Sequence, residues 1–134
     1  MLEVGEYSRL LLSLSKTYRF IGDFSSSKRY LELAKDTSAD KLTLMQFYQE
    51  SAMSLEAEEK YFQALDSNKK AFVLAKEIYN EDDFTLFEIQ ITLAESYEKA
   101  GENEKAMETF DTLFDKMDGR KDTISVRGSV RGSI

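Results

Sequence analysis

Residues 94–106 read Ala94-Glu95-Ser96-Tyr97-Glu98-Lys99-Ala100-Gly101-Glu102-Asn103-Glu104-Lys105-Ala106. A small residue stands at each end, an aromatic residue follows the first alanine by three positions, and a Gly-Glu pair lies between them. Glycine is the preferred residue just after the end of a helix, because it adopts backbone conformations that other residues avoid. The stretch therefore predicts two helices joined by a short turn, whose small residues let the two backbones approach closely.

The same spacing occurs twice more toward the N-terminus, around turns at Gly22 and Glu59. The small residues on the two sides of the three turns are Ser15 and Ser27, Ala52 and Ala64, and Ala94 and Ala106. The large residues that follow the first small residue, expected to fill the space between hairpins, are Tyr18, Leu55 and Tyr97. Repetition at this interval is typical of stacked helical units, so we expect three hairpins rather than one irregular bundle.

Apolar residues recur at helical spacing on both sides of each turn. The first expected helix ends near Ile21. The other five cover about 25–36, 39–58, 61–79, 82–100 and 103–117. Thr37 or Ser38 is expected to cap the third helix, and Asp82 or Asp83 the fifth, because short polar side chains satisfy free N–H groups at helix starts. The sequence thus predicts an all-α protein of six helices.

This pattern resembles the tetratricopeptide-repeat (TPR) family over about residues 8–118, and its long spacing is similar to the repeats of kinesin light chains and of bacterial Rap-type peptide sensors. The resemblance implies an α-solenoid of three hairpins in a right-handed superhelix, within a domain covering 1–118. The repeats would cover about 8–41, 45–80 and 87–118. The sequence departs from the family pattern at Glu59, which replaces a turn glycine, at Asn68, which replaces a large apolar residue, and in having no proline.

In such a solenoid the first helices of the hairpins line a concave groove. The register places the following candidate peptide-binding residues there: Arg9, Leu12, Lys16, Arg19, Gln46, Gln49, Met53, Glu88, Ile91, Glu95 and Glu98. The groove would be basic at one end, neutral in the middle and acidic at the other. Most aromatic residues are expected to pack between helices, and a few, such as Phe20, could serve as peptide anchors in the groove. Some TPR proteins hold a chaperone carboxylate with a Lys/Asn clamp, but the matching positions here hold Leu12, Lys16, Glu50, Glu88 and Thr92.

Catalytic and metal-binding patterns are sparse. The chain has neither His nor Cys, so the commonest general base and the strongest nucleophile are both missing, as are the preferred zinc ligands. The acidic run Glu81-Asp82-Asp83 lacks the spacing of a calcium loop and is interpreted as a helix start. We expect no enzyme activity, no catalytic residue, no metal and no cofactor.

Charge is distributed unevenly. Residues 37–119 carry nineteen acidic and eight basic side chains, whereas residues 120–134 carry one acidic and four basic. An acidic body repels nucleic acid and anionic membranes, and no run of apolar residues is long enough to cross a bilayer. We therefore expect a cytoplasmic chain that binds a protein or peptide, followed at 119–134 by a basic, flexible tail that either stays in solution or visits acidic groove residues.

Two functional hypotheses remain open. The first is a non-catalytic interaction module, an adaptor or regulatory scaffold that holds an extended peptide or a partner helix. The alternative is a structural fragment of a longer solenoid or a unit that forms homo-oligomers. An exposed apolar face on the last helix would favour the alternative, and its residues are Met107, Phe110, Leu113, Phe114 and Met117.

Overall fold

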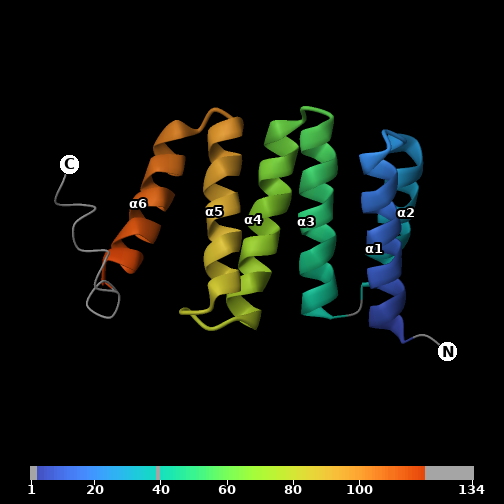
Figure 1. The fold of residues 1–134 in the computed structure, drawn as a ribbon, viewed down its shortest axis with the longest axis horizontal. Coiled ribbons are helices and arrows are strands. Elements are labelled where there is room, and N and C mark those ends of the chain that lie inside the picture. Colours follow the sequence, from blue (N-terminus) through green and yellow to red (C-terminus); the bar gives the residue numbers. More distant parts are fainter. Residues whose placement is uncertain (1–2, 39, 120–134) are drawn as a thin grey trace.

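A computed structural model describes residues 3–38 and 40–119 (Figure 1). Its helices are α1 (Val4–Phe20), α2 (Phe24–Thr37), α3 (Lys41–Ala57), α4 (Tyr61–Ile78), α5 (Phe84–Lys99) and α6 (Asn103–Gly119). They pack in consecutive pairs, α1 with α2, α3 with α4 and α5 with α6. The prediction of an all-α chain of paired helices is confirmed, although each pair begins three or four residues before the expected repeat. The predictions for the tail fall on 120–134, outside the described residues.

Figure 1 shows the three hairpins side by side in a row, with the turn inside each hairpin on the same side of the row, at the top of the view. All three turns have the same hydrogen bonding. The N–H groups of Asp23, Lys60 and Glu102 donate to carbonyls five residues earlier, at N···O distances of 2.9, 2.8 and 2.9 Å. The residue before each donor has a positive φ: 85° at Gly22, 61° at Glu59 and 84° at Gly101. Glu59 therefore occupies a conformation that costs a non-glycine residue about 1–2 kcal/mol.

Aspartate side chains cap the starts of α2, α3 and α5. Asp83 caps α5, as expected, by accepting a 2.8 Å hydrogen bond from the Thr85 N–H. The expectation for the third helix was wrong, because Asp40 caps α3 and accepts a 2.8 Å bond from the Thr43 N–H. The hydrogen bonds from Thr43 hold the pKa of Asp40 below its usual value. Ser38 instead ends α2, where its hydroxyl donates to the Ala34 carbonyl at 2.7 Å.

The small residues on the two sides of each turn are all buried: Ser15, Ser27, Ala52, Ala64, Ala94 and Ala106 expose between 0% and 3% of their surface. In the first hairpin the two serines bond across the helix pair. Ser15 Oγ donates to the Ser27 carbonyl at 2.8 Å, and Ser27 Oγ donates to the Ser15 carbonyl at 2.7 Å. Small side chains are needed here because they let the paired helices approach, which supports the predicted register.

Two apolar core clusters each extend from one hairpin into the first helix of the next. One cluster joins the first hairpin to α3: Leu11, Leu12, Leu31, Ala34 and Phe47. A second joins the second hairpin to α5: Met45, Ala71, Ala75, Leu86 and Ile89. Tyr18, expected to fill the space between hairpins, stacks on Tyr30 of its own hairpin with ring centroids 5.4 Å apart, and Tyr30 packs against the cluster that reaches α3. No helix in 3–38 and 40–119 is both long and apolar enough to cross a membrane.

Candidate functional site

Helices α1 and α3 line an open groove of about 270 Å³. Its described lining residues are Arg9, Leu12, Ser13, Lys16, Gln46, Gln49, Glu50 and Met53. Because α1 packs directly on α3, the groove faces of the two helices adjoin. The structure thus brings together six of the predicted groove residues, three from each helix.

The groove has an apolar floor and a basic rim. Leu12 exposes only 5% of its surface and belongs to the core cluster under α1 and α3, so it offers the groove one face of its side chain. Arg9 and Lys16 are exposed on α1. Met53 exposes 45% of its surface on α3, and its flexible thioether adapts to partners of different shape.

Arg19 was expected to offer a free positive charge to a ligand in the groove, but it forms an ion pair within the protein. Its Nη2 atom lies 3.1 Å from Glu50 Oε2, and the two side chains are only 12% and 16% exposed. The same nitrogen lies 3.6 Å from Met53 Sδ. The charge of Arg19 is therefore compensated inside the molecule, and the ion pair joins α1 to α3 rather than facing a ligand.

Phe20 is the last residue of α1 and lies beside the turn to α2. It exposes 71% of its surface, and the Arg19 guanidinium and the Lys16 ammonium lie 5.0 and 5.8 Å from its ring centroid. A cation over an aromatic ring adds about 0.5–1 kcal/mol at exposed sites. Phe20 thus holds two of the predicted basic side chains near the groove.

The predicted residues of the third hairpin do not belong to the described lining of this groove. Glu88, Glu95 and Glu98 are exposed on α5, and Ile91 is half-buried. A 3.3 Å ion pair between Lys99 and Glu56 connects α5 with α3. The acidic residues of α5 therefore form a separate stretch of surface beside the α1–α3 groove.

Sequence reasoning did not select Ser13 and Glu50 as binding residues, although both line the groove. Ser13 lies one helical turn from both Arg9 and Lys16, so helical periodicity alone could have identified it.

Two further cavities contain residues that no sequence pattern had identified. One of about 270 Å³ lies between α2, α3 and α4 around Ser51 and Ser67, and one of about 380 Å³ includes Tyr48 and Val73.

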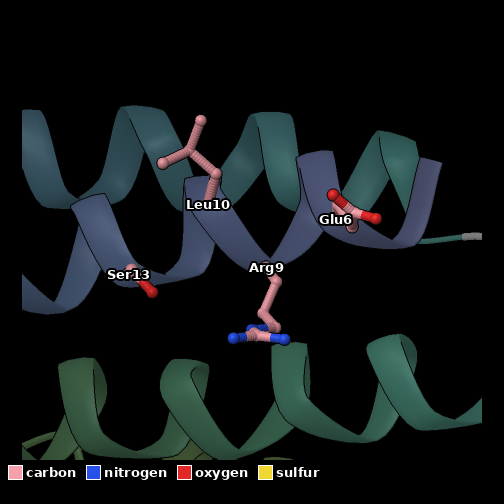
Figure 2. A pocket seen from close by; sticks show the side chains of 4 residues that line it. All are labelled: Glu6, Arg9, Leu10 and Ser13. Atoms are coloured by element: carbon pink, nitrogen blue, oxygen red, sulfur yellow. The ribbon is translucent and has the colours of Figure 1, made fainter. Parts of the chain in front are cut away.

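A larger cavity, of about 410 Å³, lies against α1 and is lined by Glu6, Arg9, Leu10 and Ser13 (Figure 2). Figure 2 shows Arg9 and Leu10 pointing to opposite sides of α1. Arg9 also lines the α1–α3 groove, so it stands at the boundary between the groove and the outer side of α1.

The apolar residues of the last helix are covered unevenly. Leu113 exposes only 3% of its surface, and Phe110 and Met117 are half-buried. Met107 and Phe114 expose 64% and 38%. The helix therefore exposes two of the five residues of the apolar face that would favour the alternative, Met107 and Phe114.

The residues of the α1–α3 groove can bind a ligand through charge, through amide hydrogen bonds and through apolar contact. Within 3–38 and 40–119, no group of three or more His, Cys, Asp or Glu side chains is arranged to hold a metal ion. No protein-family model matches the chain, and no curated protein matches it. A functional assignment therefore has to follow from the groove itself.

Proposed function

We propose that the chain is a non-catalytic interaction module, a TPR-type right-handed solenoid that binds an extended acidic peptide segment in the α1–α3 groove. The observation that carries the proposal is the composition of that groove. It combines exposed Arg9 and Lys16 with an apolar floor at Leu12 and an adaptable apolar contact at Met53.

Charge favours an acidic ligand. Neither Arg9 nor Lys16 forms an ion pair with another described residue, whereas Arg19 is neutralised by Glu50. Arg9 and Lys16 each lie one turn from Ser13, so the two cations are about two turns apart on one helix. They attract carboxylates spaced along a ligand. Such pairs are worth only about 0–1 kcal/mol each when exposed, so they steer a ligand without supplying all of its affinity.

The opposite wall favours an extended backbone. Gln46 and Gln49 are half-buried in the groove wall, and each amide can donate and accept hydrogen bonds. An extended peptide presents free N–H and C=O groups to such amides, whereas a helix uses its own. An apolar ligand side chain would then lie over Leu12 and Met53, where removal of apolar surface from water supplies the rest of the affinity.

The proposal is tested with a fluorescent peptide of alternating Glu and Leu residues. The double variant Arg9→Glu/Lys16→Glu should weaken binding at least about tenfold, which is about 1.4 kcal/mol, and added salt should weaken binding to the parent. The matched control, Lys35→Glu/Lys105→Glu, reverses two exposed charges outside the groove and should bind like the parent.

Two results would contradict the proposal. Unchanged affinity of the Arg9/Lys16 variant would remove the groove as the binding site. An equal loss in the Lys35/Lys105 variant would show that binding follows net charge and not this surface. Replacement of Arg19 is a poor test, because it would also leave Glu50 without its partner.

A further inference from the structure

The second hairpin has a serine where the other two hairpins have a leucine. Eight residues before the positive-φ residue of the turn, the sequence has Leu14 in the first hairpin, Ser51 in the second and Leu93 in the third. Leu93 is a buried core residue, and Ser51 is buried as well. A buried serine in place of leucine leaves space unfilled and brings a polar group into the interior, and both changes lower stability.

The space beside Ser51 is the cavity of about 270 Å³ between α2, α3 and α4. Ser51, Ser54 and Ser67 line this cavity and expose only 9%, 3% and 9% of their surface. Within residues 3–38 and 40–119, none of the three hydroxyl groups has a hydrogen-bond partner. Buried polar groups in proteins nearly always have one. Three unpaired hydroxyl groups around one cavity therefore indicate that a bound molecule supplies the partners.

The charged residues beside the cavity favour a cation. Lys28 and Glu32 are the charged residues of the described lining. Lys28 Nζ donates a 3.0 Å hydrogen bond to Glu58 Oε2, so its charge is compensated. Glu32 is exposed and forms no ion pair with another described residue. The uncompensated charge beside the cavity is therefore negative.

We propose that the α2–α3–α4 cavity binds a small free primary amine with an apolar body. The apolar body would lie against Leu31, Phe47 and Leu55, which line the cavity. An ammonium group has three N–H donors, which serine hydroxyl groups can accept, and Glu32 would balance its charge. An engineered cavity of roughly 150 Å³ accepts benzene, so a cavity of about 270 Å³ has room for one aromatic ring with a short amine chain.

This site is separate from the peptide groove. The α2–α3–α4 cavity and the α1–α3 groove share none of their described lining residues. Binding of the amine and binding of the acidic peptide can therefore be measured independently, and the failure of one proposal leaves the other standing.

NMR titration of the ¹⁵N-labelled protein with 2-phenylethylamine tests the choice of ligand. The amide signals of the cavity residues should shift and saturate. The neutral analogue 2-phenylethanol should bind at least about threefold more weakly, and phenylacetate more weakly still, because the first lacks the charge and the second reverses it. A parent protein that binds no amine would show that the cavity holds water only, and preferred binding of phenylacetate would contradict the sign of the charge; either result overturns the proposal.

The role of Glu32 is tested by charge removal. Glu32→Gln should weaken binding of 2-phenylethylamine at least about threefold and leave binding of 2-phenylethanol unchanged. Asp36→Asn is the matched control, because Asp36 is an exposed carboxylate about one turn further along α2 and does not line the cavity. Equal losses in the two variants would show that the amine responds to net charge and not to this site.

Filling the cavity tests its position. Ser51→Leu introduces the leucine of the other two hairpins, so it should abolish amine binding and raise the midpoint of urea unfolding. It should still bind the acidic peptide, because Ser51 does not line the α1–α3 groove. Ser54→Ala adds no volume and should weaken the amine about threefold, through loss of one hydroxyl group. Parent-like amine binding by both variants, or a lower urea midpoint for Ser51→Leu, would overturn the proposal.

Discussion

The crossing in the first hairpin and the crossing in the third hairpin occupy the same register but use different chemistry. Ser15 and Ser27 exchange hydrogen bonds between side chains and backbone carbonyls of α1 and α2, whereas Ala94 and Ala106 meet the same requirement with methyl groups. All four residues expose at most 3% of their surface. The position therefore requires a small side chain. A serine is accepted there when its hydroxyl group finds a hydrogen-bond acceptor.

The largest effect is expected from adding volume. Ala94→Leu inserts a branched side chain at a position with no exposed surface, so it should lower the free energy of unfolding by about 1–3 kcal/mol. Urea denaturation measures this. The control Thr92→Leu places the same leucine side chain two residues away at an exposed position and should unfold like the parent. A variant at Ala94 that unfolds like the parent would show that α5 and α6 do not cross there.

A smaller effect should distinguish the polar crossing from the apolar one. Ser15→Ala removes a hydrogen bond and should cost about 0.5–1.5 kcal/mol. Ser15→Ala/Ser27→Ala converts the first crossing to the chemistry of the third and should cost less than the sum of the two single variants, because the 3.1 Å contact between the two Oγ atoms is lost in either single variant and can be lost only once. The measurement is a double-mutant cycle in urea. Strictly additive losses would mean that the two serines do not act as a pair.

The smallest effect concerns the turns that follow these crossings. Glu59→Gly should stabilise the second hairpin by about 0.5–1 kcal/mol, since relief of a left-handed conformation outweighs the greater freedom of glycine in the unfolded chain. Gly101→Ala should act in the opposite direction, because φ there is 84° while nothing lies within 4 Å of an added Cβ. Thermal unfolding of both variants checks this. A destabilised Glu59→Gly would indicate that the side chain of Glu59 contributes more than its backbone conformation costs.

Local features of the chain were predictable because they depend on neighbours close in sequence. The turn at Glu59 was placed correctly without a glycine, since the small residues and large apolar residues around it repeat at the same spacing. The start of α3 was misplaced, because Thr37, Ser38 and Asp40 are all good capping residues. The choice depended on which carboxylate or hydroxyl could reach a free N–H, and Asp40 does so through Thr43.

The candidate site was only partly predictable. Helical spacing placed Arg9 and Lys16 on one side of α1, and the structure places them with Gln46 and Gln49 in one groove. The pairing of Arg19 with Glu50 could not be read from spacing, because the two residues are 31 positions apart and meet only when α1 packs on α3. The same packing makes Leu12 part of the core.

The amino-acid sequence by itself determined the helices, the turns and the small residues at the crossings, because helical periodicity and backbone conformation are local properties. Only the tertiary structure decided which equivalent positions are covered. Leu10 and Phe47 stand at the same distance from their turns, yet the first is 48% exposed and the second 7%. The physical reason is that burial depends on which helices pack together: Phe47 packs against Leu31 and Ala34 of α2, whereas Leu10 belongs to neither core cluster of the described residues.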